Sequence, residues 1–174
     1  MITNLLGTDG DWVLALLRIV LGVVFFAHGA QKLFGWFGGH GVSATIRMFW
    51  DQLGIPAPLA YLAIAAEFLG GLGLIVGLLA RIAALGIAIT MAVAMVKVHL
   101  QHGFFLNWFG DKPGHGFEYH LLAIALAVLV IVHGAGAFSI DRALYRHLVS
   151  PDNVALEFNL VIPFLFRIRS TFFK

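Results

Sequence analysis

The stretch Trp12–Phe34, WVLALLRIVLGVVFFAHGAQKLF, decides the fold of this chain. About 20 consecutive apolar residues are enough for a helix to cross the hydrocarbon core of a bilayer, and this stretch is long enough to do so. Three more stretches of similar character follow, at about 58–79, 82–100 and 118–138. We therefore predict an all-α membrane protein, an antiparallel bundle of four transmembrane helices contained in residues 1–148.

The composition supports a membrane protein and excludes several other classes. Of the 174 residues, 60% are hydrophobic and 11% are charged, and the mean hydropathy of +0.93 is too high for an ordinary soluble domain. The chain contains no cysteine, which excludes disulfides and thiol redox chemistry. No basic face or RNA-binding motif indicates a nucleic-acid partner. The predicted partner is membrane lipid.

The connections between the predicted helices contain interfacial segments. The first holds SATIRMFWDQLGIP, in which Ser43 can cap a short amphipathic helix lying in the membrane interface and Gly54 can end it. After the fourth helix, Ser139 is a candidate N-cap for a short cytoplasmic helix. Residues 149–174 then form an interfacial or partly disordered tail.

Basic residues predict the orientation in the membrane. One side holds Lys32, Arg47, Lys97 and Lys112, and the opposite side holds the larger set of Arg81, Arg142, Arg146, Arg167, Arg169 and Lys174. Because cytoplasmic loops are enriched in Lys and Arg, both termini are predicted to be cytoplasmic. Between the helices, Gly73 and Gly77 form a GxxxG pair that predicts a close helix contact.

Polar residues inside the predicted helices are the candidate functional residues, because an ionisable group in a membrane needs a partner or a cavity. From the cytoplasmic helix ends, at 1.5 Å per residue, Glu67 lies about 18 Å deep and His28 and Lys97 about 23 Å deep. All four helices would then bring polar groups into the outer half of the bundle.

We expect four of these groups to carry the chemistry, namely His28, Lys32, Glu67 and Lys97. A His or Lys can donate to a carbonyl oxygen while a carboxylate relays protons. The expected ligand-binding residues are Arg18, Gln31, Glu118 and Trp36. The alternative is structural, with Arg18 and Glu67 forming a buried ion pair that fixes helix register while Lys32 and Lys97 extend to the surface.

A second cluster lies in VHLQHGFF and GFEYH. His99 and His102 are three residues apart, and Glu118 and His120 open the fourth helix on the same side of the membrane. His99, His102 and His120 are therefore candidate ligands for a metal or a haem. The alternative is interfacial hydrogen bonding, because HxxH alone matches no specific metal site.

Several motifs together resemble the DoxX family of small bacterial four-helix membrane proteins. They are LRIVLGVVFFAHGAQKLFGWFGGHG, LGIPAPLAYLAIAAEFLGGLGLIVGLLAR, HGFF with GFEYHLL, and GAGAFSIDRAL, which cover about residues 12–144. The chain departs from the family pattern at Ala135 and Ala137, and His102 and His120 are not part of that pattern. The residues that match it are Arg18, Gly22, His28, Gly29, Lys32, Gly54, Pro56, Glu67, Gly70, Gly77, Arg81 and Glu118.

The resemblance implies a multi-pass protein of the bacterial inner membrane and a link to quinone-dependent oxidoreductase complexes. The first functional hypothesis is therefore a quinone-binding or accessory subunit of a membrane oxidoreductase, with redox-enzyme subunits as partners. The second is a non-enzymatic bundle that binds a lipid or small molecule or scaffolds a redox partner. A redox protein holding a metal or haem is the third, and an oligomer is compatible with all three.

Overall fold

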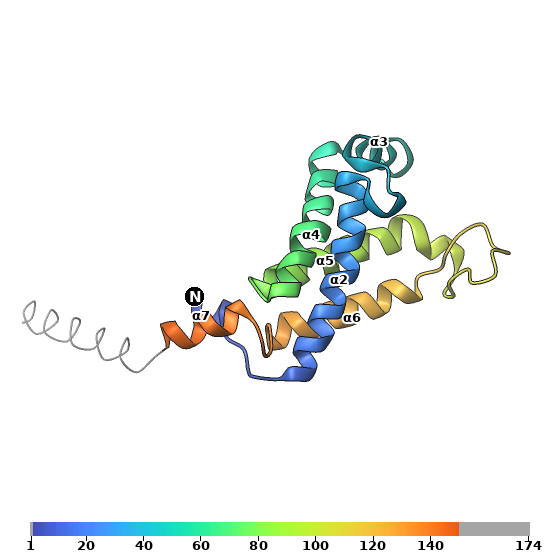
Figure 1. Cartoon of the computed structure of the whole chain (residues 1–174). Coiled ribbons are helices and arrows are strands. Elements are labelled where there is room, and N and C mark those ends of the chain that lie inside the picture. The colour runs from blue at the N-terminus through green and yellow to red at the C-terminus, as the bar shows by residue number, and fades with distance from the viewer. Residues whose placement is uncertain (1, 150–174) are drawn as a thin grey trace, which may run out of the picture.

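The computed structural model describes residues 2–149, in which the regular secondary structure is all helix and no strand occurs (Figure 1). The all-α prediction is confirmed for this part of the chain. The predicted tail lies outside the described residues from position 150 onward. In chain order the α-helices are α1 Ile2–Leu6, α2 Trp12–Phe34, α3 Gly41–Leu53, α4 Ala57–Val76, α5 Ala80–Ala94, α6 Glu118–His133 and α7 Ile140–Leu148.

Three helices are long and apolar enough to cross a membrane. They are α2 with 23 residues, α4 with 20, and a run of 23 residues, Ala80–His102, in which α5 continues through a π-helical turn, Met95–His99, and a 3₁₀ turn, Leu100–His102. Their large apolar side chains are widely exposed, including Leu16, Leu62 and Ile89 at 53%, 64% and 56%. Such a surface suits contact with lipid rather than water.

The predicted fourth span ends earlier than expected, because α6 stops at His133 and not at residue 138. Its 16 residues reach about 24 Å, less than the roughly 30 Å of a hydrocarbon core. Gly134 ends the helix with φ of +86°, and the chain then turns back so that Ala137 N–H donates to the carbonyl of Asp11 at 2.9 Å. A fourth crossing therefore remains a prediction.

The long helices pack as neighbouring pairs, α2 with α4 and α5 with α6, joined by contact between α4 and α5. In Figure 1 the pairs meet near the start of α5 and α7, whereas their far ends, marked by α3 and by the loop that precedes α6, lie well apart. We call the end where α1, the start of α5 and α7 meet the closed end. Polar groups far along α2 and far along α5 are consequently held apart.

Glycines set the contact between α2 and α4, but they are not the predicted pair. A Cβ added at Gly29 would lie 2.4 Å from the backbone nitrogen of Phe68, and one at Gly71 would lie 2.4 Å from that of Phe26. Only a residue without a side chain allows the two backbones this close. Gly77 instead terminates α4 with φ of +70°. A Cβ there would lie 2.4 Å from Ser139 and 3.0 Å from the guanidinium of Arg18, so the predicted close contact at Gly77 is made with these side chains and not with a helix backbone.

The two short helices begin and end through local signals. The position before α3 is His40, so the predicted cap at Ser43 was wrong, while Gly54 ends the helix in the left-handed region as expected. Ser139 caps α7, its Oγ accepting from the N–H of Arg142 at 3.3 Å, as predicted.

Buried charges hold the closed end together through backbone groups. Asp141 is 1% exposed, and its carboxylate accepts from the N–H groups of Leu79 and Ala80 at 2.8 and 2.9 Å, capping the start of α5. Arg81 donates to carbonyls at the end of α6 and to the carbonyl of Gly7. The first free amides of α5 and the last carbonyls of α6 thereby find partners away from water.

Candidate functional site

An ion pair between Lys32 of α2 and Glu67 of α4 is the centre of the candidate site. The Lys32 ammonium bonds Oε2 of Glu67, and within residues 2–149 the structure contains no other ion pair. The side chain of Glu67 is 4% exposed and that of Lys32 is 25% exposed. The carboxylate is thus enclosed, and the lysine connects it to the surface.

The close helix contact at Gly29 explains why these two residues meet. Gly29 lies against the backbone of Phe68, and Lys32 is one turn further along α2 while Glu67 directly precedes Phe68. Residues three apart share a helix face, so Lys32 is directed towards the same part of α4. A charge buried without a partner is costly, and the pairing offsets that cost.

A row of aromatic rings runs beside the ion pair. Phe26 stacks on Phe68 at 5.1 Å between ring centroids, Phe68 meets Phe34 edge-on at 5.3 Å, and Phe34 contacts Trp36 at 5.0 Å. Trp36 and Phe34 are each 51% exposed. The row presents aromatic faces and edges, since Phe34 and Phe68 stand at 84° to each other, and it includes Trp36, which the sequence singled out.

The side chains of the other two expected catalytic residues form no hydrogen bond or ion pair with Lys32 or Glu67. His28 is exposed, and its Nδ1 lies 3.2 Å from Oε1 of Gln31, whose amide nitrogen donates to the carbonyl of Phe37. Gln31 thereby holds the turn after α2, where Phe37 adopts φ of +53°. Lys97 is exposed on the π-helical turn, and its side chain forms no hydrogen bond or ion pair within the described residues.

Arg18 does not pair with Glu67, contrary to one expectation. It is fully buried and donates to five carbonyls, those of Leu74 and Ile75 near the end of α4 and those of Ala135, Ala137 and Phe138 beyond α6. The carbonyls at a helix end lack intrahelical partners, and a guanidinium offers five donors to satisfy them. Arg18 therefore contributes to the closed end, away from the Lys32–Glu67 pair.

Tyr119 is a residue that the sequence reasoning missed. Its hydroxyl is buried with no hydrogen-bond partner, and the residue is close enough to Glu67 to interact with its charge. A tyrosine at the end of an apolar helix is typical of the aromatic belt at a membrane surface, so its position alone carried no signal. An unpaired buried hydroxyl costs about 1–3 kcal/mol and marks a place for an additional polar partner.

The second predicted cluster forms only in part. The rings of His99 and His120 contact each other with centroids 4.1 Å apart, and Nδ1 of His120 is buried without a partner. His99 Nδ1 lies 2.8 Å from the carbonyl of His115, while Nε2 of His102 lies 3.5 Å from the amide nitrogen of Gln101 and its ring lies against Gly114. Glu118 accepts from the N–H of Leu106 at 2.8 Å and so ties down the loop before α6.

This arrangement does not fit a metal or haem centre well. Across residues 2–149 no group of three or more His, Asp or Glu side chains is placed to hold a metal ion. Two axial imidazoles of a haem stand on opposite faces of the porphyrin, whereas the rings of His99 and His120 touch. The contacts of His99 and Glu118 with backbone groups match the hydrogen-bonding alternative.

Comparison with known proteins gives consistent matches. The sequence profile of the DoxX family matches residues 13–100, which include both Lys32 and Glu67. The chain is 28% identical over 131 residues to "Putative oxidoreductase CatD" of Bacillus subtilis (strain 168), covering 75% of this chain and 86% of the relative. It is 28% identical over 129 residues to "Inner membrane protein YqjF" of Escherichia coli (strain K12), covering 74% and 89%. No solved structure matches the chain.

Proposed function

Because this chain belongs to the DoxX family of membrane proteins, we propose that it is a quinone-binding or accessory subunit of an oxidoreductase complex in the bacterial inner membrane. In this proposal the quinone headgroup contacts the Lys32–Glu67 pair, and a partner subunit supplies the electrons. In this proposal both termini lie in the cytoplasm, and the excess of Lys and Arg on one side supports this orientation.

The observation that carries the proposal is the enclosed carboxylate paired with a partly exposed lysine. Quinone reduction to quinol consumes two electrons and two protons, so a site needs a donor to the carbonyl oxygen and a group that takes up protons again. The Lys32 ammonium is suited to the first role and the Glu67 carboxylate to the second. The unpaired hydroxyl of Tyr119 is a second donor in the same region.

The surroundings suit a flat apolar ring. The row formed by Phe26, Phe68, Phe34 and Trp36 offers ring faces and edges beside the ion pair, and aromatic contacts of this kind contribute about 0.5–1.5 kcal/mol each. The name of the Bacillus subtilis relative, "Putative oxidoreductase CatD", points to the same class of function for that relative.

A matched set of variants tests the assignment. The purified full-length protein is titrated with a short-chain ubiquinone or menaquinone analogue, with tryptophan fluorescence quenching as the readout. Lys32→Gln and Glu67→Gln are expected to weaken binding about tenfold or more, because each removes a charge-assisted contact. Lys97→Gln is the control, since it removes an exposed lysine of the same type. Equal binding by all four proteins, or no binding by the wild type, would contradict the proposal.

A specific observation favours the second function, a non-enzymatic bundle that binds lipid or scaffolds a redox partner. The charged side chains of Arg18, Arg81 and Asp141 all form hydrogen bonds with backbone groups, so charge in this fold serves packing. If Lys32 and Glu67 do the same, Glu67→Gln will lower the unfolding temperature while quinone binding stays absent from every variant. Mass spectrometry of co-purified molecules would then find lipid and no quinone.

A further inference from the structure

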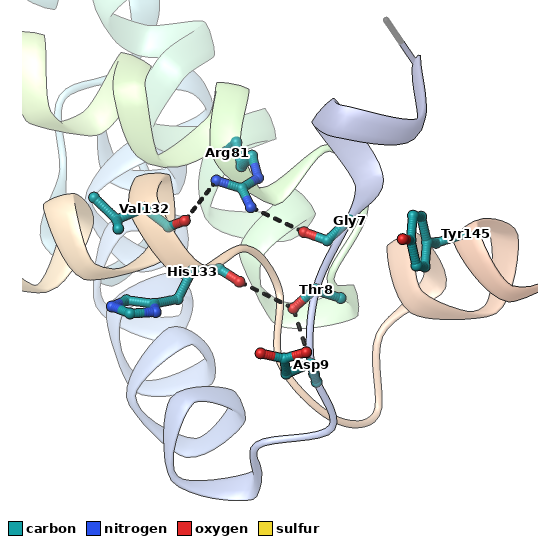
Figure 2. Close-up of a pocket in the computed structure, with 7 residues that line it drawn as sticks. All are labelled: Gly7, Thr8, Asp9, Arg81, Val132, His133 and Tyr145. Carbon is teal, nitrogen blue, oxygen red and sulfur yellow. Dashed lines mark hydrogen bonds between the residues drawn. The ribbon is translucent and has the colours of Figure 1, made fainter. Parts of the chain in front are cut away.

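A polar pocket of about 290 Å³ opens at the closed end (Figure 2). Neither Lys32 nor Glu67 lines it. Its lining comes from four places, the link between α1 and α2, the start of α5, the end of α6, and α7. The side chains that matter for the argument are Thr8, Asp9, Arg81, Val132, His133 and Tyr145.

The pocket contains two opposite charges that are not paired with each other. Arg81 donates to the carbonyl of Ile131 and, at 2.9 Å each, to those of Val132 and Gly7, and its Nε is buried without a partner. No carboxylate in residues 2–149 forms an ion pair with it. Asp9 is exposed, and no hydrogen bond within those residues ends on its carboxylate. The wall therefore presents a cationic and an anionic site at once.

The hydroxyls of Thr8 and Tyr145 add hydrogen-bonding groups to the lining, whereas the imidazole of His133 points away from both in Figure 2. The hydroxyl of Thr8 bonds the carbonyl of His133 at 3.2 Å and accepts from the N–H of Gly136 at 2.7 Å. These bonds fix the link between α1 and α2 against the end of α6, so the pocket wall is built from both.

The pocket lies where two apolar helices, α5 and α6, begin and end, which is the position at which headgroups meet a membrane helix. Arg81 is the second residue of α5 and His133 is the last residue of α6, and both helices expose apolar side chains directly beyond these ends. On α6, Val132 is 60% exposed and Leu129 is 41% exposed; on α5, Ile82 and Leu85 are 52% and 50% exposed. Each pair is three residues apart and therefore shares one face of its helix, which gives acyl chains a surface continuous with the pocket.

We propose that this pocket binds a phospholipid whose headgroup carries both a phosphate and a primary ammonium, as in phosphatidylethanolamine. Arg81 faces the phosphate, with the phenol of Tyr145 as a further donor, and Asp9 accepts from the ammonium. A quaternary ammonium cannot donate hydrogen bonds to Asp9, and an anionic headgroup without an amine leaves Asp9 with a like charge beside it. The inference does not depend on quinone binding.

The test uses native mass spectrometry of the delipidated full-length protein in detergent, with equal amounts of dioleoyl phosphatidylethanolamine, phosphatidylcholine and phosphatidylglycerol. The wild type is expected to retain phosphatidylethanolamine about three- to tenfold more than either other lipid, the range for one partly exposed charge pair with its hydrogen bonds. Asp9→Asn should lose this preference, and Asp9→Glu should keep it. Asp51→Asn, which changes an exposed carboxylate on α3, should behave as the wild type.

A soluble headgroup separates a lipid site from a site for free phosphate compounds. Glycerophosphoethanolamine lacks acyl chains and is expected to leave the bound lipid in place even at a hundredfold excess. Equal retention of the three lipids, a preference for phosphatidylglycerol, a preference that survives in Asp9→Asn, or displacement by glycerophosphoethanolamine would each overturn the proposal. Thermal unfolding of every variant checks that the fold is kept, since Asp9 makes no side-chain hydrogen bond in residues 2–149.

Discussion

Replacing Arg18 by lysine should destabilise the protein strongly although the charge is kept. The guanidinium serves five carbonyls, and an ammonium has three N–H donors, so at least two carbonyls lose their partner. Hydrogen bonds from a charged donor contribute about 1.5–3 kcal/mol each. The site is fully buried, and water cannot replace the lost bonds there. We expect Arg18→Lys to lower the free energy of unfolding by about 3–6 kcal/mol.

The measurement is equilibrium unfolding in mixed micelles, with the fraction of SDS as denaturant and tryptophan fluorescence as signal. Arg47→Lys is the matched control, because Arg47 is exposed on α3 and its side chain makes no hydrogen bond within the described residues. Surface substitutions of this kind change stability by less than about 0.5 kcal/mol. The difference between the two variants therefore isolates the carbonyl contacts.

Combining Arg18→Lys with Glu67→Gln tests whether Arg18 bonds only the carbonyls at the closed end or also pairs with Glu67. Because the structure gives the two residues separate partners, the losses in Arg18→Lys and Glu67→Gln should add in the double variant to within about 0.5 kcal/mol. If Arg18→Lys lowers the free energy of unfolding by less than about 1 kcal/mol, the carbonyl argument is refuted. If the double variant is no less stable than either single variant, the result instead supports an ion pair between Arg18 and Glu67.

Three further predictions concern the helix contacts and caps. Gly71→Ala should destabilise the protein by about 1–3 kcal/mol in the same unfolding assay, because the new Cβ would lie 2.4 Å from a backbone nitrogen. The matched variant Gly70→Ala, whose Cβ would lie 3.4 Å from its nearest atom, should be neutral or stabilising by up to about 1 kcal/mol. Asp141→Asn should cost about 1–3 kcal/mol, since an amide presents one oxygen and one donor to two N–H groups; an unchanged unfolding midpoint would contradict this. Glu118→Ala should speed hydrogen exchange of the Leu106 amide about tenfold, and an unchanged rate would show that Glu118 does not hold the loop.

Membrane insertion and the local helix signals follow from the order of residues alone. The length of the apolar runs predicts three spans that the structure also has, because insertion depends on the sum of side-chain hydrophobicity along a continuous helix. Gly54 and Ser139 end and begin helices as expected, since a cap involves neighbours within four residues. The early end of α6 at Gly134 was missed because a long-range turn onto Asp11 competes with continued helix.

The partner of each polar side chain was decided by the tertiary structure. Depth along a helix follows from counting residues, but the direction in which a side chain points across the bundle depends on how each helix is rotated and where its neighbours lie. Glycine contacts between α2 and α4 bring Lys32 to Glu67, 35 positions away in the chain, and the segment after α6 brings carbonyls to Arg18 from more than 100 positions away. The two helix pairs diverge beyond the closed end, and this keeps the far end of α2 apart from the loop that precedes α6 (Figure 1). These distances come from packing between helices, which no local pattern of residues encodes.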